Sequence, residues 1–395
     1  VYALSLAVYC TSWTFYGGVG RAASHGLDFT LIYVGPILVI TLGFPMMRKI
    51  TRVAREQNIT SVADFIAARY GKSRVIAAAA TLIALVGVLP YIALQLQAVS
   101  LSFGALATGL DGRGRAPVWT DTALHVALTM AVFAILFGVR HVQANERHQG
   151  MILAIAFESL VKLGAILAAG AFVTFGMFDG PGDLTARLLS MPALQARLEG
   201  FSVGPEWVSI TVMSALAFLC LPRQFHVGVV ESGRPADLRT ARWLFPAYLG
   251  AINVFVPAFA VAGLLLLGPA ADPDLFVLSL PMAAGDPLLS LAVFLGGLSA
   301  ATGMVIVETV ALSTMISNEL VLPLLLRGGM AARGDGALGP TVLRIRRIAI
   351  FGILLLAYAY HAVIGGSLPL ASIGLIAFCA VAQLGPALIA GLYWR

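Results

Sequence analysis

The chain has 395 residues, of which 59% are apolar and 11% are charged. Soluble domains contain about 45–50% apolar and about 25% charged residues, so no soluble fold of this size could remove so much apolar surface from water. The mean hydropathy of +0.92 excludes a soluble enzyme, a disordered chain and a collagen-like chain, and it predicts an integral membrane protein. The net charge of +6 does not indicate nucleic-acid binding, because the charges follow the predicted sides of the membrane.

A membrane-spanning helix needs about 20 mostly apolar residues, and ten stretches of the chain qualify. They are residues 1–19, 30–47, 75–106, 122–139, 151–178, 208–230, 244–267, 288–312, 348–364 and 370–394. Proline kinks or interrupts a helix, so we expect a kink at Pro90 and an interruption at Pro222. We expect the eighth span to continue as a cytoplasmic helix through Leu326, and a short surface helix near residues 184–198.

Lysine and arginine divide unevenly between the two alternating sets of loops. Loops 20–29, 107–121, 179–207, 268–287 and 365–369 contain only Arg21, Arg113, Arg115, Arg187 and Arg197. Lys162 and Arg223 fall inside spans, and all other basic residues lie in loops 48–74, 140–150, 231–243 and 327–347 or at Arg395. Because Lys and Arg are enriched in cytoplasmic loops, the basic loops and both ends of this chain are predicted to be cytoplasmic.

The three cysteines, Cys10, Cys220 and Cys379, lie in apolar runs, so we expect small core residues rather than a disulfide or metal framework. The chain starts at Val1 with no basic segment before its first apolar stretch, which does not indicate a signal peptide. It stops directly after a predicted span. We therefore expect residues 1–395 to form one membrane domain of a longer protein.

Ionisable groups near mid-membrane cost about 2.5–3.5 kcal/mol each on insertion scales, so each needs a reason. Glu158 and Lys162 are four residues apart in the fifth span and share one helix face, so the sequence predicts that they pair. The pair would lock the helix against its neighbours or serve a solute or proton path. Glu308, in the eighth span, has no local partner, so it could carry a proton or hydrogen-bond to a neighbouring helix.

Polar residues follow the proline of the sixth span. Proline frees carbonyl groups near mid-helix, and irregular backbone at that depth is tolerated only inside protein or against a watery cavity. Arg223, Gln224 and His226 offer donors suited to a carboxylate or an amide. We predict a solute site here; the alternative is a kinked helix whose polar residues lie at the cytoplasmic edge.

Hydroxyl and aromatic side chains gather in the first span. They suit a small polar organic solute, although Trp and Tyr also mark membrane interfaces. We single out Ser12, Trp13 and Tyr16 as candidate solute contacts, together with Gln95 of the third span.

Catalytic motifs are missing from the sequence. The chain contains no HExxH, GxSxG or Walker A sequence, so we expect neither enzyme activity nor a cofactor. His141, Glu146 and His148 cluster in a predicted cytoplasmic loop. Their spacing is a poor metal signature, and we interpret them as a solvated turn.

Four short strings resemble the sodium:solute symporter family, which includes proline permease. Residues 64–74 resemble the loop after the family's second core helix, residues 146–149 its acid-x-x-Gln loop, and residues 316–320 the end of its eighth core helix. Residues 224–226 resemble its Gln-Pro-His motif, with Phe225 in the proline position. The resemblance covers essentially the whole chain, in order.

Three further strings, residues 10–17, 156–163 and 221–227, are similar to one subgroup of that family. In this subgroup the transporter domain is fused ahead of PAS and histidine-kinase domains, as in the CbrA-type sensor kinases. The resemblance implies an all-α membrane domain with the leucine-transporter fold, in which five helices are followed by five inverted ones. The first and sixth helices are then broken around a midplane site.

Two departures from the family bear on the coupling ion. The family's sodium site uses two hydroxyl residues in the eighth helix; here Gly303 and Met304 fall there, beside Thr302. A carboxylate of the first helix falls on Cys10. Sodium prefers oxygen ligands, so these losses count against sodium coupling, although backbone carbonyls could still bind it weakly. Residues 7–16 contain no Gly or Pro, so the sequence does not predict unwinding of the first helix.

We therefore expect a transporter-type domain that binds a small polar metabolite, an amino acid or a carboxylate, between the first, third, sixth and eighth spans. The coupling candidates are Glu308, Thr302, Glu158 and Lys162, with H⁺ favoured over Na⁺. The resemblance implies a bacterial inner membrane and an input role for a fused kinase and its response regulator. A non-transporting receptor and a plain sodium:solute symporter are the alternatives.

Overall fold

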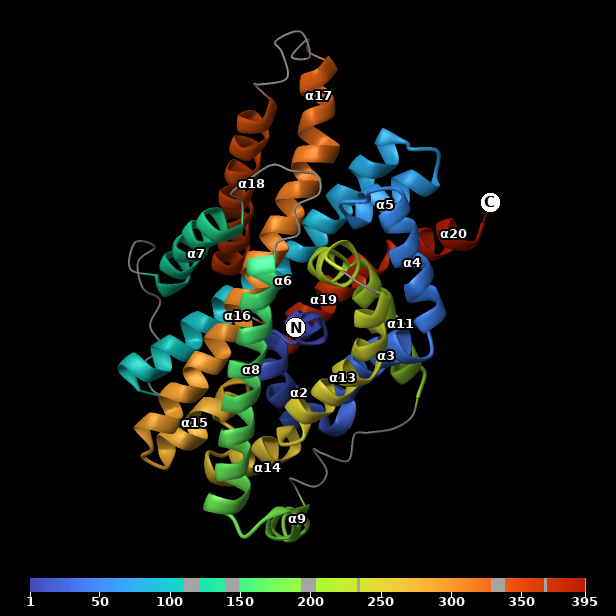
Figure 1. The fold of residues 1–395 in the computed structure, drawn as a ribbon. Coiled ribbons are helices and arrows are strands. Elements are labelled where there is room, and N and C mark those ends of the chain that lie inside the picture. Colours follow the sequence, from blue (N-terminus) through green and yellow to red (C-terminus); the bar gives the residue numbers. More distant parts are fainter. Residues whose placement is uncertain are drawn as a thin grey trace.

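The computed structural model describes residues 1–109, 121–138, 149–192, 204–232, 235–327, 338–365 and 368–394. All regular structure in these ranges is helical, as Figure 1 shows. The α-helices are α1 (Tyr2–Ser5), α2 (Gly18–His25), α3 (Leu31–Thr41), α4 (Phe44–Glu56), α5 (Val62–Arg69), α6 (Arg74–Thr108), α7 (Thr122–Phe133), α8 (Gln149–Ala171), α9 (Pro181–Leu189), α11 (Pro205–Cys220), α12 (Pro222–Phe225), α13 (Pro235–Asn253), α14 (Val256–Leu266), α15 (Phe276–Ala283), α16 (Pro287–Met315), α17 (Leu322–Arg327), α18 (Leu338–Tyr360), α19 (Leu370–Ala382) and α20 (Gly385–Tyr393).

Helices occur in all ten predicted spans. Among the described residues, the segments long and apolar enough to cross a membrane are Trp13–Thr41, Arg74–Ala107, Gly150–Met177, Ala236–Leu266, Pro287–Leu326, Gly339–Ile364 and Leu370–Tyr393. The pair Pro205–Cys220 and Pro222–Val230, bent by 58°, forms one more. The fourth predicted span is the shorter apolar helix Thr122–Leu136.

The first and second predicted spans share the helical segment Trp13–Thr41, but the chain turns inside it. Gly26, between α2 and α3, has a φ of 61°, a conformation that glycine adopts without the steric cost other residues meet. The two halves also have different neighbours, because α2 packs on α14 whereas α3 packs on α11. Residues before and after Gly26 therefore pack against different parts of the bundle.

The long helix α16 is the axis around which the candidate site is built. It packs against α8, α6 and α18, while α19 packs along α6. In Figure 1 it rises from beside α15 and continues upward into α17. The helical segment runs from Pro287 to Leu326, which confirms the predicted extension of the eighth span.

Three local expectations are refined by the structure. Pro90 lies inside α6 without interrupting the helix. The predicted surface helix near 184–198 begins earlier, at Pro181, and α9 ends at Leu189; residues 193–203 lie outside the described part. Cys10 and Cys220 are buried as expected, but Cys379 is exposed, because it lies on the outer face of α19.

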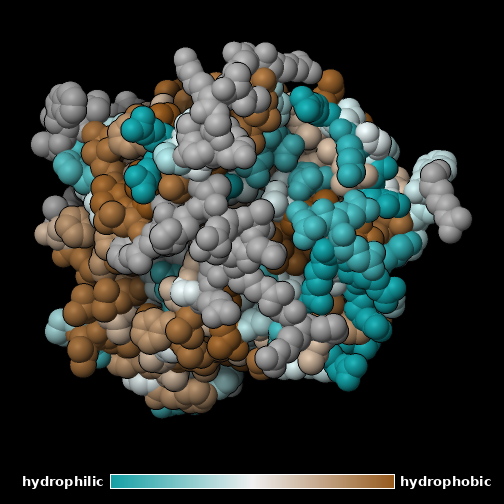
Figure 2. Space-filling view, turned by 45° about the horizontal axis from the view of Figure 1, so that its top comes forward, coloured by the Kyte–Doolittle hydropathy of each residue, from teal (hydrophilic) through white to brown (hydrophobic). Residues whose placement is uncertain are grey.

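Large apolar side chains cover much of the outer surface, including Val86, Phe157 and Ile348, which are 66%, 66% and 72% exposed. Contiguous apolar surface of this kind requires a lipid or protein partner, as expected for helices in a bilayer. Figure 2 shows hydrophilic side chains gathered on the side where α4 and α5 lie in Figure 1. Arg48 and Arg52 of α4 are exposed there.

Candidate solute site

The first helix is unwound at Cys10 and Thr11. The helical turn Leu6–Tyr9 ends there, Cys10 adopts extended backbone angles (φ −80°, ψ 101°), and helix resumes around Trp13. The sequence expectation did not include this break, because the segment contains neither Gly nor Pro. The physical reason is tertiary: side chains from other helices replace the lost backbone hydrogen bonds.

Lys162 of α8 supplies the first replacement. Its Nζ donates hydrogen bonds to the carbonyl oxygens of Ala7, at 2.8 Å, and Cys10, at 2.7 Å. Gln95 of α6 supplies the second, since its Oε1 accepts a hydrogen bond from the backbone N–H of Ser12 at 3.0 Å. The break is therefore held open by a buried ammonium and a buried amide.

The sixth helix breaks at Leu221, as Pro222 predicted. Leu221 has a ψ of 124°, and Pro222 begins the short helix α12 after the bend. Proline suits the first position of a helix because its missing N–H would be unpaired there in any case. The two breaks bring Arg223 and Gln224 to the interior, where they are 0% and 2% exposed.

Arg223 and Glu308 form a fully buried ion pair. Arg223 Nη1 donates to Glu308 Oε2 at 2.6 Å, and the backbone N–H of Arg223 donates to Oε1 at 3.3 Å. Glu308 was predicted to have no local partner in its own span, and the structure supplies one from α12. An ion pair without solvent contact needs this geometry, because each charge alone would carry a large desolvation cost.

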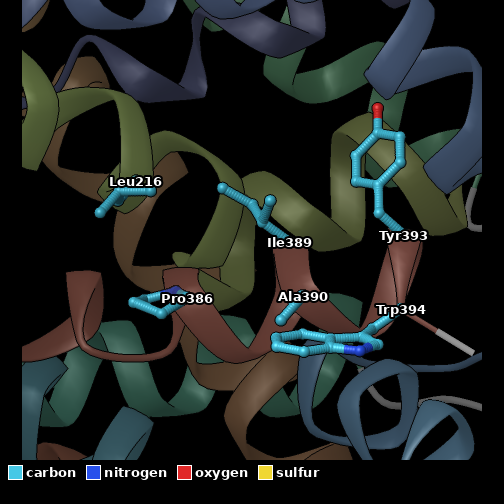
Figure 3. A pocket seen from close by; sticks show the side chains of 6 residues that line it. All are labelled: Leu216, Pro386, Ile389, Ala390, Tyr393 and Trp394. Carbon is cyan, nitrogen blue, oxygen red and sulfur yellow. The ribbon is translucent and has the colours of Figure 1, made fainter.

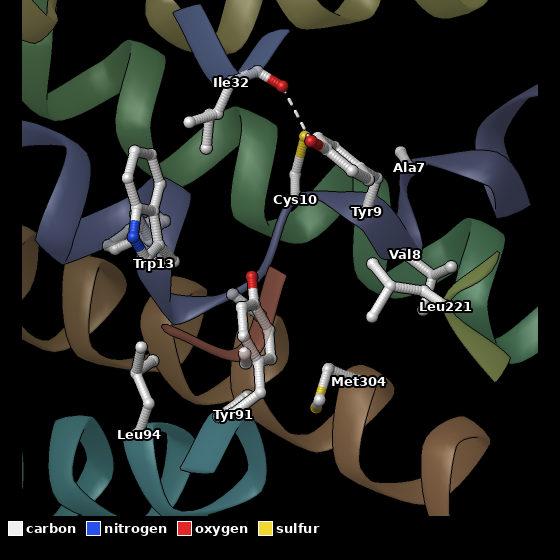
Figure 4. Close-up of a cluster of buried hydrophobic side chains, with 14 of the residues drawn as sticks. Ala7, Val8, Tyr9, Cys10, Trp13, Ile32, Tyr91, Leu94, Leu221 and Met304 are labelled. Carbon is white, nitrogen blue, oxygen red and sulfur yellow. Dashed lines mark hydrogen bonds between the residues drawn. The ribbon is translucent and has the colours of Figure 1, made fainter. Parts of the chain in front are cut away.

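Tyr91 of α6 joins the ion pair to the unwound first helix. The guanidinium of Arg223 lies 4.5 Å from the centre of the Tyr91 ring, within the range of a cation–π interaction. The Tyr91 hydroxyl hydrogen-bonds to Thr11 Oγ1 at 2.9 Å, and its carbonyl accepts from Gln95 Nε2 at 3.2 Å. Figure 4 shows this hydroxyl pointing toward the Cys10 segment.

Several buried polar atoms at these breaks have no hydrogen-bond partner within the described residues. They are Arg223 Nε and Nη2, Ser12 Oγ and Gln224 Oε1. Buried polar groups are normally hydrogen-bonded, so unpaired donors and acceptors on converging elements are the features expected of a binding site. Two guanidinium N–H groups suit a carboxylate in particular.

The remaining predicted solute contacts lie around this centre rather than in it. Trp13 Nε1 donates to the carbonyl of Ala371 in α19 at 3.0 Å. The Tyr16 ring occupies space that a side chain at Gly297 of α16 would fill. These two aromatic residues therefore fasten the second half of the first helix to α19 and α16.

Gln224 and His226 point toward the other half of the first helix and the end of the sixth. Gln224 Nε2 lies 3.4 Å from the carbonyl oxygen of Leu6. His226 Nε2 lies 3.4 Å from Glu231 Oε1, and the two side chains are nearly fully buried. The nearest charged partner of His226 is therefore Glu231 at the end of the sixth helix.

The predicted Glu158–Lys162 pair is not formed. Lys162 turns to the carbonyls of the first helix, and Glu158 Oε1 instead accepts a hydrogen bond from Thr302 Oγ1 at 3.2 Å. Gly303 leaves room for the carboxyl group, because a Cβ there would overlap Glu158 Oε2. The i,i+4 rule describes an isolated helix. Here the Lys162 ammonium instead donates hydrogen bonds to two backbone carbonyls of the first helix.

The centre of the site is closed in this conformation. Ser12, Gln95, Arg223 and Glu308 are all 0% exposed, and the cavity beside Gln224 measures only about 10 Å³. A larger groove of about 610 Å³ lies on the surface between α11 and α20, lined by Leu216, Pro386, Tyr393 and Trp394 among others (Figure 3). It contains none of the predicted contacts, so it is not the candidate site.

Thr11 and Tyr91 were missed by sequence reasoning. Thr11 belongs to the hydroxyl-rich first span, but no local signal distinguishes it from its neighbours. Tyr91 precedes Gln95 by one helical turn, which is a usable signal because residues four apart share a face. Of the loop predicted as a solvated turn, His141, Glu146 and His148 lie outside the described residues.

No protein-family model and no curated protein matches the chain. Among solved structures, the chain is similar to a Na⁺-coupled sialic acid symporter in a substrate-bound, outward-open state. The TM-score is 0.64 with 13% sequence identity, and the match covers 100% of this chain and 79% of that one. At this identity the likeness shows the fold alone. The chain therefore has the all-α, leucine-transporter-like membrane fold that the sequence predicted.

Proposed function

We propose that this chain is a transporter-type membrane domain that binds a small polar metabolite, an amino acid or a carboxylate, at the junction of its two broken helices. The unpaired donors of Arg223 and the hydroxyl of Ser12 support this assignment. A solute carboxylate would take the free Nε–H and Nη2–H of Arg223 while Nη1 stays on Glu308. Tyr91, beneath the guanidinium, would orient it.

The observation that carries the proposal is the position of the Lys162 ammonium on the carbonyls of Ala7 and Cys10. Backbone carbonyls freed by an unwound helix are the groups that bind cations in this fold class. A protein ammonium already occupies two of them. The domain is therefore proton-coupled or ion-independent rather than sodium-coupled, and the sodium coupling of the structural neighbour belongs to that protein.

In this mechanism the protonated Lys162 holds the first half of the first helix against α8. Loss of its proton would remove the charge-assisted hydrogen bonds to both carbonyls and release that half-helix to move. Glu308 is the second proton candidate, because protonation would weaken its bond to Arg223 and free one more N–H for the solute. Each step shifts a population between closed and open states.

The resemblance to the CbrA-type subgroup supports an input role for a fused histidine kinase in a bacterial inner membrane, with the basic loops cytoplasmic. Its three strings, 10–17, 156–163 and 221–227, contain Cys10, Lys162 and Arg223. These residues belong to three different helices that meet at the breaks. The similarity therefore falls on the candidate site and not only on the surface.

Uptake in proteoliposomes tests the proposal. Labelled amino acids and small carboxylates would be offered while sodium and pH gradients are varied separately. The expected result is accumulation that responds to the pH gradient, or to neither gradient, and is indifferent to sodium. Uptake driven by sodium and indifferent to pH would refute the coupling. Saturable binding without accumulation would identify a receptor, the second function that this site permits.

A further inference from the structure

A second cavity lies outside the candidate solute site, between α6, α7, α8 and α16. Its volume is about 670 Å³. Apart from Glu158, His125 and three threonines, the side chains that line it are apolar. The cavity extends along α7 from Thr122 to Phe133, a helix length of roughly 16 Å. It is therefore elongated, with the shape of a hydrocarbon chain rather than of a compact polar solute.

The cavity opens toward the bilayer. Phe103 and Phe133, which line it, are 48% and 50% exposed, and nearby Val132 and Leu295 are 54% and 47% exposed. Exposed apolar side chains of this density mark lipid-facing surface in a membrane protein. A ligand would therefore enter sideways from the membrane and not from water.

Glu158 gives this cavity a chemical preference. Its carboxyl lines the cavity and accepts a hydrogen bond from Thr302. Lys162, its nearest basic residue along the helix, is committed to the carbonyls of the first helix. His125 is the other titratable group in the lining, and its Nδ1 lies 2.9 Å from the carbonyl oxygen of Asp121. Neither α6 nor α16 adds a basic side chain to the lining.

Leaving an ionised carboxylate unpaired in an apolar, lipid-facing cavity is costly, so a positively charged ligand group would be bound favourably beside Glu158. We propose that this cavity binds lipophilic amines: molecules with a protonated nitrogen and a hydrocarbon tail. The ammonium would bind Glu158 and Thr302, and the tail would lie between α7 and α16 along Phe294 and Phe133. This site is separate from the Arg223–Glu308 centre and does not depend on the proposed transport function.

Photolabelling tests the proposal. The protein in phosphatidylcholine nanodiscs would be labelled with a diazirine-bearing dodecylamine or with the matching dodecanol, and the labelled peptides mapped by mass spectrometry. The amine should label the lining segments of α7 and α16 at least about tenfold more than the alcohol. This ratio corresponds to the free energy of one hydrogen bond to a charged group. Glu158→Gln should remove this difference and Glu158→Asp should retain part of it.

Two controls make the outcome decisive. Asp183→Asn removes a carboxyl on α9 that is 24% exposed and paired with Arg187, and it should leave the amine labelling unchanged. Leu298→Trp fills the cavity while keeping Glu158, and should reduce labelling by both molecules even if the Glu158 variants fold poorly. Equal labelling of the native protein by amine and alcohol would overturn the proposal. So would an amine preference that survives in folded Glu158→Gln, or unchanged labelling in Leu298→Trp.

Discussion

The side-chain nitrogen of Lys162 lies 2.7 Å from the carbonyl oxygen of Cys10, at the point where the first helix is unwound. The two residues are 152 positions apart in the chain. Their contact places a positive charge on backbone oxygens that the break has freed. It also explains why Lys162 does not pair with Glu158, four residues earlier on the same helix.

Replacement of Lys162 by Met should abolish the response of uptake to a pH gradient, because the group that gains and loses the proton is gone. The Cys10 carbonyl would lose its partner, at about 1–3 kcal/mol, whereas the Ala7 carbonyl would keep the Cys10 N–H, so the melting temperature should also fall. Uptake at varied internal and external pH, with thermal unfolding alongside, measures both effects. Lys162→Arg keeps a positive charge that cannot be released, so it should retain more of the stability than Lys162→Met and still lose the pH response. A pH response that persists in folded Lys162→Met protein would eliminate Lys162 as the coupling group.

Arg223→Ala should weaken solute binding by about 1.5–3 kcal/mol, the worth of a hydrogen bond between charged groups. Equilibrium binding of the transported solute measures this change. The substitution leaves the Glu308 carboxylate buried without its partner, so Glu308→Gln is the matched control for that effect. Unchanged affinity in a well-folded Arg223→Ala protein would remove Arg223 from the site.

The Arg223–Glu308 pair should also show strong coupling in stability. Loss of either partner from a buried ion pair costs about 3–5 kcal/mol, whereas replacing both by apolar residues is often nearly neutral. We expect Arg223→Met and Glu308→Met each to lower thermal stability sharply, and the double variant to recover most of it. A double-mutant cycle from chemical unfolding provides the measurement. Additive losses would mean that the two groups do not interact.

Gly303→Ala should destabilise the packing of α8 against α16. A Cβ at this position would overlap Glu158 Oε2, and overpacking of this kind costs about 1–3 kcal/mol. Combining it with Glu158→Ala, which removes the clashing carboxyl, should restore part of the loss. Melting temperatures of the two single variants and the double variant test this. If Gly303→Ala has the same melting temperature as the native protein, the Glu158 carboxyl does not lie against Gly303.

Asp274, in the turn Pro273–Leu275 before α15, should make stability depend on pH. Its Oδ2 accepts a hydrogen bond from the Leu370 backbone N–H at 2.9 Å, and burial raises the pKa of this carboxyl to about 6 from 3.8. Between these values the folded state holds a proton that the unfolded state has released. Stability therefore falls by about 3 kcal/mol as the pH rises from roughly 4 to 6, and stays level above that.

Asp274→Asn should remove this dependence, because an amide keeps the acceptor for Leu370 without the charge. The variant should be more stable than the native protein at pH 7, and the difference should vanish below about pH 4. Unfolding followed across this range measures it, with Asp183→Asn on α9 as control. If the stability difference between the native protein and Asp274→Asn does not change from pH 4 to 6, the pKa of Asp274 is not raised.

The amino-acid sequence by itself was enough to identify a helical membrane protein and to place an apolar helix in each predicted span, although the first two spans share one helical segment and the fourth is shorter than a full span. Long apolar runs such as 75–106 and 288–312 indicate membrane-spanning helices, because a helix is a structure that satisfies all of its own backbone hydrogen bonds in lipid. The break at Leu221 was likewise readable, because proline acts on its own turn of helix. These features depend on neighbours a few residues away.

The contacts of the site were decided by tertiary structure. The break at Cys10 has no Gly or Pro to announce it, because it is stabilised by Lys162 of α8 and Gln95 of α6. Glu308 pairs with Arg223, which is 85 residues away in the sequence. Helical periodicity does not predict contacts between residues so far apart. A buried charge shows in sequence that some partner must exist. Only the packing of the helices determines which partner it is.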